Sequence, residues 1–203
     1  MNVYYLGGSP CSGKSTAAEI IAEKYGLYYF KVDDFLEKYT AMGKEKGYEI
    51  CSRVSLMSPE ETWMRKPEVQ CEEELKIYGE MINFIMDDIK RISSDKDIIA
   101  EGAAFLPDLM RKLGIDDQHY ICITPTKDFQ IDHYKNREWV PYVLEGCSDK
   151  EKAFENWMER DALFAESVRK QCEKTSYISI ITDENSDVND RIKTVCRQFN
   201  LYI

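Results

Sequence analysis

The sequence predicts an α/β fold with three layers, in which helices cover both faces of a five-stranded parallel sheet (α/β/α). The first observation is that five short apolar runs alternate with helical segments along the 203 residues, as they do in parallel sheets. The second is a glycine-rich loop that joins the first apolar run to the first helical segment. No repeat, low-complexity tract or linker interrupts the sequence, so we expect residues 1–203 to form one domain.

The glycine-rich loop lies between an expected strand at Val3–Leu6 and an expected helix at Ala17–Lys24. It reads Gly8-Ser9-Pro10-Cys11-Ser12-Gly13-Lys14-Ser15, followed by Thr16, and has the phosphate-binding pattern of two glycines separated by four residues and then Lys-Ser. Main-chain N–H groups, the helix N-terminus and the Lys14 ammonium attract a polyanion in such a loop, and the Ser15 hydroxyl can ligate Mg²⁺. We therefore expect residues 8–16 to bind the phosphates of ATP together with Mg²⁺.

The elements that follow are expected in this order. Gly26 suits the position after the first helix, and the next strand and helix are expected at Leu27–Val32 and Phe35–Lys44. The stretch Tyr48–Met57 has no clear period, and we expect it to be a mobile segment on the acceptor side. Ser58–Glu61 has the capping-box pattern with proline at the first helical position, which predicts a short helix.

The rest of the chain continues the alternation. Apolar residues three and four apart predict a long helix that packs on the sheet: Leu75, Tyr78, Ile82, Ile85, Ile89 and Ile92. The remaining strands are expected at Asp97–Glu101, His119–Thr124 and Tyr177–Thr182. The remaining helices are expected at Lys127–Glu138, at Val188–Phe199, and from a second capping box at Ser148–Glu151 to about Lys174.

Composition limits the partners. The formal net charge of −10 argues against a general nucleic-acid binder. The seven cysteines form no Cys-x-x-Cys pair, which is typical of reduced thiols in a cytoplasmic protein. No apolar run approaches membrane-spanning length. We therefore expect a cytoplasmic monomer or homodimer whose partner is a small-molecule phosphoryl acceptor, with neither nucleic acid nor membrane.

The order of these features resembles the small-metabolite and nucleotide kinases of the shikimate, gluconate and adenylate kinase type. The resemblance rests on the phosphate loop, the acid after the second strand, a Glu-Gly after the third, and a lid followed by an Arg-x-x-x-aromatic helix. It implies a P-loop NTPase fold with a substrate-side helical segment at about 35–94 and a helical lid at about 135–150. No Asn-Lys-x-Asp guanine-reading motif follows a strand, which argues against a GTPase.

Three acids fall at the carboxyl ends of expected strands, where doubly wound sheets bind their ligands. Asp33, Leu36 and Glu37 resemble the Asp-x-x-Ile-Glu signature of shikimate kinases, which implies that Asp33 holds the acceptor and accepts its proton. Lys31 stands where an earlier acid of an Asp-x-Asp pair would be, so Asp34 is the candidate for the Mg²⁺-side and acceptor contacts. The alternative is that the two aspartates only cap the next helix.

The third acid, Glu101, ends an apolar strand in the manner of the acid that orders Mg²⁺-bound water in phosphate-loop proteins. Glu101-Gly102-x-x-x-Leu106-Pro107 also resembles a stretch of 2-phosphoglycerate kinase-like proteins. This short similarity suggests a small acidic metabolite and implies that Glu101 and Gly102 contact it. The alternative is a strand-end acid that pairs with a lysine or faces water.

Cations must cover the transferred phosphoryl group and an anionic acceptor. The resemblance implies that Arg137 of the lid stacks on adenine or clamps phosphates. It implies that Arg160, which begins an Arg-x-x-x-Phe stretch where shikimate kinases have Arg-x-x-x-Tyr, meets the acceptor's anionic group. Arg53 and Arg65 are further cations on the acceptor side.

The adenine is expected against the loop Thr182–Asn185, with Asp183 among the nucleotide contacts. Inside the phosphate loop, we expect Cys11 to be a small tolerated side chain. The alternative is that Lys14 and the helix N-terminus lower the pKa of its thiol and make it oxidisable.

Three functions remain open from the sequence. The first is ATP- and Mg²⁺-dependent phosphoryl transfer to a small anionic metabolite, with Lys14, Asp33, Arg137 and Arg160 as catalytic residues. The second is a nucleoside or nucleotide kinase of the cytidylate or adenylate type. The third is a regulatory protein that binds the nucleotide and transfers nothing.

Overall fold

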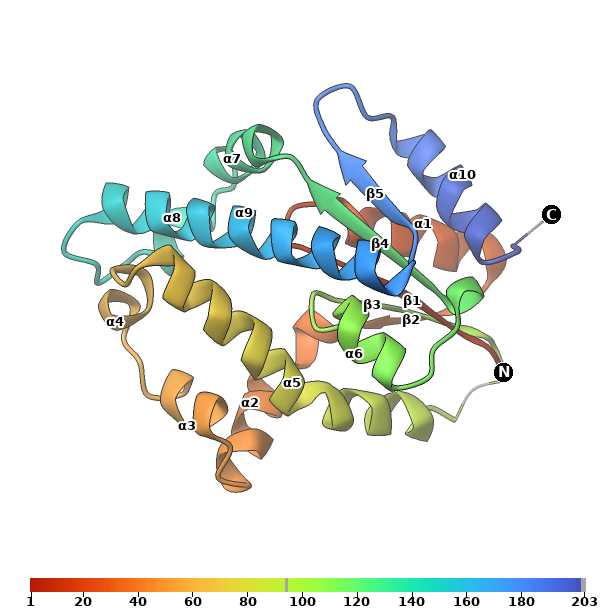
Figure 1. Cartoon of the computed structure of the whole chain (residues 1–203), viewed down its shortest axis with the longest axis horizontal. Helices are drawn as coiled ribbons and strands as arrows, with labels where there is room; N and C mark the ends of the chain where they lie inside the picture. The colour runs from red at the N-terminus through yellow and green to blue at the C-terminus, as the bar shows by residue number, and fades with distance from the viewer. Residues whose placement is uncertain (94, 202–203) are drawn as a thin grey trace.

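The computed structural model of the protein describes residues 1–93 and 95–201. These residues form a five-stranded, all-parallel sheet with the strand order β2-β3-β1-β4-β5 (Figure 1). The strands are β1 (Val3–Gly8), β2 (Tyr28–Lys31), β3 (Ile98–Glu101), β4 (Tyr120–Pro125) and β5 (Ser179–Thr182). The predicted α/β class is confirmed, and each strand lies within two residues of its predicted bounds.

The two faces of the sheet are covered by different helices, because side chains along a strand alternate between the faces. Tyr4 and Leu6 of β1 belong to the core with α1 (Lys14–Tyr25) and α10 (Val188–Gln198). Tyr5, between them, belongs to the core of the other face. There α5 (Pro67–Arg91) and α9 (Lys150–Thr175) run side by side (Figure 1).

Shorter helices connect these layers. Two are 3₁₀ turns, η1 (Val32–Phe35) and η2 (Asp117–His119). The others are α2 (Leu36–Glu45), α3 (Glu49–Val54), α4 (Pro59–Trp63), α6 (Pro107–Lys112), α7 (Lys127–Lys135) and α8 (Val140–Val143).

One predicted irregular segment was wrong. The stretch Tyr48–Met57, for which the sequence gives no period, contains the helix α3. Its cap comes from another helix: the Glu80 carboxylate of α5 accepts the backbone N–H groups of Ile50 (3.0 Å) and Cys51 (2.8 Å). A carboxylate in this position satisfies free N–H groups and complements the helix dipole.

Of the two predicted capping boxes, only that at Ser58 and Glu61 forms. Helix α9 begins instead with Asp149, whose side chain accepts the N–H of Lys152 (2.9 Å). Ser148 turns to α4, where its N–H and hydroxyl donate to Glu60 (2.7 and 2.8 Å). This contact ties the end of the predicted lid to α4.

The predicted lid, residues 135–150, has a small core of its own. Val140, Leu144 and Cys147 pack with Trp157 at the start of α9, and Trp63 of α4 stacks on Trp157 with ring centroids 4.7 Å apart. All seven cysteines are free thiols. Among the helices in the described ranges, we find none with the length and apolar character needed to cross a bilayer.

Candidate active site

The phosphate loop connects β1 to α1 through backbone conformations that favour glycine. Gly8 has φ of 129° and Gly13 has φ of 83°. A Cβ on Gly8 would lie 1.8 Å from the carbonyl oxygen of Ile123 in β4, and a Cβ on Gly13 would lie 3.0 Å from the guanidinium carbon of Arg191. The backbone of β4 therefore leaves no room for a side chain at Gly8, whereas at Gly13 the Arg191 side chain would have to shift by a few tenths of an ångström.

Hydrogen bonds within the loop, and from Thr182 and Arg191, stabilise the loop conformation. Lys14, which is 7% exposed, donates from Nζ to the carbonyl oxygen of Ser9 (2.8 Å). Behind the loop, the Thr182 hydroxyl donates to the carbonyl oxygen of Ser12 (2.9 Å), and Arg191 of α10 donates to the Thr182 hydroxyl (2.8 Å). Burial lowers the pKa of Arg191. Arg191 was not predicted from the sequence, because nothing in its sequence context separates it from other arginines on charged helices.

The loop lines a cavity of about 270 Å³ together with residues that are distant in sequence. These are Lys31 and Asp33 after β2, and Tyr134, Arg137 and Trp139 from the end of α7 and the predicted lid. Of the predicted catalytic residues, Lys14, Asp33 and Arg137 line this one cavity. The Arg137 guanidinium lies over the rings of Tyr134 (5.2 Å) and Trp139 (5.6 Å).

The cavity's chemistry fits a triphosphate. Its floor is a curled main chain at the N-terminus of α1, with the Lys14 side chain folded into the curl. The buried hydroxyls of Ser9 and Ser12 have no hydrogen-bond partner among the described residues. Converging N–H groups, a helix N-terminus and an ammonium group together form an anion site.

A hydroxyl and a carboxylate next to the loop fit Mg²⁺. The Ser15 hydroxyl donates to Glu101 Oε1 (2.9 Å), and the Tyr29 hydroxyl donates to the same oxygen (3.1 Å). Glu101 is 1% exposed, and its Oε2 has no partner among the described residues. Burial and the Glu101 charge raise the pKa of Tyr29, so its hydroxyl stays protonated and keeps donating.

Other predicted contacts near the loop lie elsewhere. Asp34 does not line the cavity; its carboxylate lies 4.0 Å from the Lys31 ammonium. Gly102 packs beneath η1, where a Cβ would lie 2.6 Å from the Cβ of Val32. No three His, Cys, Asp or Glu side chains gather within residues 1–93 and 95–201 to form a metal cage, so most ligands of a bound Mg²⁺ would have to be phosphate and water oxygens.

Comparisons with known proteins place this geometry in a known fold. No family model matches the sequence, and no curated protein matches it. Among solved structures, TT1252 from Thermus thermophilus is similar with a TM-score of 0.54 at 12% identity, covering 100% of this chain and 98% of that one. A shikimate kinase from Acinetobacter baumannii, solved in complex with shikimate, has a TM-score of 0.50 at 13% identity, covering 97% of this chain and 90% of that one.

The chain shares the three-layer fold of this shikimate kinase. An uncharacterized protein from Eubacterium ventriosum is also similar, with a TM-score of 0.50 at 15% identity and full coverage of both chains. The predicted resemblance to shikimate-kinase-like proteins is thus confirmed for the fold. Identities of 12–15% show the fold alone.

Within this fold, Arg160 lies outside the phosphate-loop cavity. Its guanidinium is held between Glu74 of α5 (2.9 Å) and Asp161 (2.6 Å), and it lies over the Trp63 ring (5.2 Å). The side chain is only 11% exposed. Burial raises the pKa of Asp161 to about 6, although Arg160 opposes this shift. Arg160 therefore already has two carboxylate partners from the chain itself.

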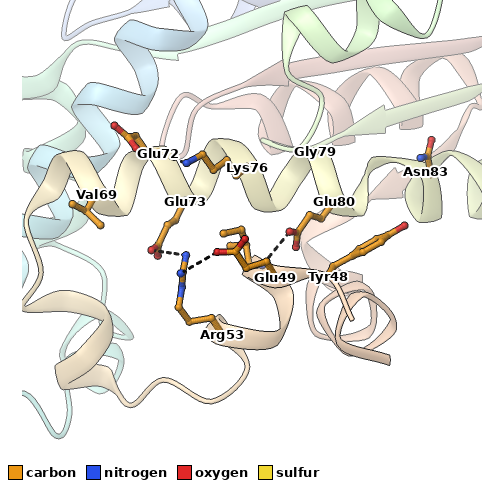
Figure 2. A pocket seen from close by; sticks show the side chains of 11 residues that line it. Tyr48, Glu49, Arg53, Val69, Glu72, Glu73, Lys76, Gly79, Glu80 and Asn83 are labelled. Atoms are coloured by element: carbon orange, nitrogen blue, oxygen red, sulfur yellow. Dashed lines mark hydrogen bonds and ion pairs between the residues drawn. The ribbon is translucent and has the colours of Figure 1, made fainter. Parts of the chain in front are cut away.

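Arg53 and Arg65 are paired in the same way. Both bind Glu73 of α5: Arg53 contacts Oε1 (2.8 Å) and Arg65 contacts Oε2. Figure 2 shows Arg53 reaching Glu73 and Glu49 on the wall of an open groove between α3 and α5, whose volume is about 670 Å³. All three arginines that the sequence predicts for the acceptor are thus in ion pairs with the protein.

Two further predictions for the nucleotide side concern Asp183 and Cys11. The Asp183 carboxylate accepts from the Ser186 hydroxyl (2.7 Å) and from the N–H of Asn185 (3.1 Å), so it stabilises its own turn after β5. The alternative of an activated Cys11 was wrong: burial raises the pKa of its thiol and outweighs Arg137 and Lys14.

Proposed function

We propose that the protein transfers the γ-phosphoryl group of ATP, with Mg²⁺, to a hydroxyl group of a small molecule. The observation that carries this proposal is the single cavity that the phosphate loop shares with Asp33 and Arg137. Such a cavity combines a polyanion site, a carboxylate able to accept a proton and a cation able to neutralise charge. These are the parts that phosphoryl transfer requires.

Each side chain has a role that follows from its position. The loop amides and Lys14 would hold the β- and γ-phosphates, and Ser15 would ligate Mg²⁺. Glu101, held by Tyr29, would orient a water on that ion. When bound, Mg-ATP supplies the phosphoryl group and part of the charge neutralisation.

Asp33 is exposed to the cavity and bears no ion pair among the described contacts, so its carboxylate is available to the acceptor. The acceptor oxygen forms a bond to the γ-phosphorus, the bond to the bridging oxygen of ADP breaks, and Asp33 takes the hydroxyl proton. Arg137 would neutralise charge on the phosphoryl oxygens. Tyr134 and Trp139 would exclude water, which would otherwise compete as the acceptor.

The acceptor's predicted negative charge lacks a free partner. Arg53, Arg65 and Arg160 are each paired with a carboxylate of the chain, so an anion that binds them would share the guanidinium with that carboxylate. We therefore propose a small-molecule acceptor without assigning it that charge.

The test combines calorimetry with an ATP-consumption screen over sugars, sugar acids, phosphorylated acids, nucleosides and nucleoside monophosphates. Asp33→Asn should keep ATP affinity and lower kcat by about 10²-fold or more. Asp34→Asn, on the neighbouring exposed carboxylate, is the matched control and should remain close to the wild type.

Absence of Mg²⁺-dependent ATP binding would overturn the proposal, and so would unchanged turnover of Asp33→Asn. Nucleoside monophosphates as the preferred acceptors would instead indicate the nucleotide kinase. ATP binding without consumption in the presence of any acceptor would indicate the non-catalytic regulator.

A further inference from the structure

A second, smaller cavity lies between α4, α5 and α9. Its volume is about 70 Å³, and its polar lining residues are Thr62, Arg65, Gln70, Glu73, Glu74 and Arg160. Because one water needs about 10–15 Å³ by this measure, the cavity has room for a group of a few non-hydrogen atoms. On α5, residues 70, 73, 74 and 77 fall on one face, since they are spaced by three and four.

This inner cavity adjoins the phosphate-loop cavity through two residue pairs. Tyr134 lines the phosphate-loop cavity and interacts with Asp161, the ion-pair partner of Arg160. On the other side, the Tyr78 hydroxyl donates to Glu74 (2.6 Å), and burial together with Glu74 and the nearby Asp33 raises the pKa of Tyr78. The inner cavity thus lies on the same side of the molecule as Asp33, separated from the phosphate-loop cavity by the side chains of Tyr78, Tyr134 and Asp161, and that an acceptor spans both is part of the proposal below.

The hydrogen bonds of Gln70 indicate which chemical group a ligand in the inner cavity must provide. Its Nε2 donates to the carbonyl oxygens of Arg65 (2.9 Å) and Trp63 (3.4 Å), which fixes the orientation of the amide. Its Oε1 is buried and has no hydrogen-bond partner among the described residues, on a side chain that lines the inner cavity. The residue is 4% exposed. Because buried carbonyl oxygens are nearly always hydrogen-bonded, Oε1 is positioned to accept from a donor on a ligand.

The charges around the inner cavity are balanced. Glu73 forms ion pairs with Arg65 and Arg53, and Arg160 forms ion pairs with Glu74 and Asp161. An incoming carboxylate or phosphate would have to share an arginine with Glu73 or Glu74, and these partly buried carboxylates would repel it. An incoming ammonium group would be repelled by the arginines in the same way. An uncharged donor meets neither repulsion.

We propose that the inner cavity is the acceptor subsite of the kinase proposed above, and that it binds an uncharged hydrogen-bond donor of the acceptor through Gln70. The acceptor is then a neutral polyhydroxylated or amide-bearing small molecule. This inference rests on the proposed function for the identity of the ligand as acceptor. The donor chemistry of the cavity stands independently of it.

The test uses acetamide and acetate, which have the same size and shape but differ in charge and in N–H donors. Protein labelled with ¹⁵N-glutamine is titrated with each, and the side-chain amide signal of Gln70 is followed by NMR. A saturable shift with acetamide and none with acetate is the expected result. A shift of similar or greater size with acetate, or no shift with either compound, overturns the proposal.

Two variants separate this site from the rest of the protein. Gln70→Leu assigns the signal and should remove the acetamide effect, which is then followed through the indole signals of the tryptophans. Gln130→Leu is the matched control, because Gln130 is also buried and also has an unpartnered Oε1, but it lies on α7 and donates to the carbonyl oxygen of Met158 (3.2 Å). If Gln70→Leu does not fold, the Gln70 amide signal is assigned by through-bond correlation in ¹³C,¹⁵N-labelled wild type, and the wild-type titration then decides.

A kinetic comparison distinguishes failure of the subsite from failure of the kinase proposal. Gluconate, gluconamide and glucitol are compared as acceptors, and the neutral compounds should exceed the acid by about a hundredfold or more in kcat/KM. An acetamide shift without ATP binding refutes the kinase proposal alone. ATP consumption with a preference for gluconate refutes the neutral subsite alone. If none of the three compounds is consumed, the NMR titration decides.

Discussion

Replacing Gly8 by alanine tests whether the shape of the phosphate loop is fixed by its neighbours. The new Cβ would lie 1.8 Å from the carbonyl oxygen of Ile123, whereas real Cβ contacts are essentially never shorter than 3.0 Å. The loop and β4 would have to separate by more than 1 Å. The hydrogen bond from Ser9 N–H to that oxygen (3.2 Å) would then be lost.

The expected cost combines overpacking of the backbone with a φ of 129° that only glycine adopts easily, and it amounts to about 4 kcal/mol. At a urea m-value of about 2 kcal/mol/M, the unfolding midpoint should fall by about 2 M. Gly26→Ala is the control: Gly26 also has a positive φ of 67°, but a Cβ there meets no atom within 4 Å. It should cost only about 1 kcal/mol.

The assay is urea unfolding of both variants, followed by calorimetry with Mg-ATP under conditions in which each is folded. Gly26→Ala should bind ATP like the wild type, and Gly8→Ala should bind it at least tenfold more weakly because the loop N–H groups no longer converge. If the two variants have similar unfolding midpoints and similar ATP affinity, the loop accommodates the Cβ at Gly8, and its contact with Ile123 does not fix the loop conformation.

Three further predictions follow from single contacts. Glu80→Gln should destabilise the protein by about 1 kcal/mol, because it weakens the cap of α3. Burial acts to raise the pKa of Glu80, but the two N–H groups outweigh it and hold this pKa below its ordinary value of 4.5. The difference in stability between variant and wild type should therefore be full at pH 7 and shrink as the pH falls through that lowered pKa. An unchanged gap between urea midpoints at pH 7 and pH 3.5 would contradict this. Tyr29→Phe removes one donor to Glu101 and should weaken Mg²⁺ affinity in the ATP complex about tenfold, measured by Mg²⁺ titration of ATP consumption; equal titration curves would show that Tyr29 does not position Glu101. Trp139→Ala opens the phosphate-loop cavity and should raise ATP hydrolysis without acceptor severalfold, measured as released phosphate, whereas a lower rate would argue against a role in excluding water.

Local signals predicted most of the fold. The phosphate loop, the strand positions and the Ser58 capping box depend on residues within a few positions of one another, so they can be read directly. The helix α3 could not be predicted because the carboxylate that caps it is Glu80, which lies 30 residues from Ile50. The start of α9 was mispredicted for a similar reason, since Ser148 bonds to Glu60, 88 residues away.

The candidate site divides in the same way. Asp33 and Arg137 were predicted from their positions after β2 and in the lid segment, and the fold brings them to the loop. Whether each arginine is in an ion pair was not predictable, because that depends on which carboxylate the fold places opposite its guanidinium. Arg160 and Glu74 are 86 residues apart and meet only because α5 and α9 pack together.

The sequence alone predicted a phosphate site, because the residues proposed for it are consecutive main-chain groups and one lysine. Which arginines are already paired with carboxylates became visible only in the folded structure. It pairs Arg53, Arg65 and Arg160 with carboxylates and leaves the buried oxygen of Gln70 without a donor among the described residues. These partners come from segments distant in sequence, and a carboxylate beside a guanidinium weakens its attraction for an anionic ligand.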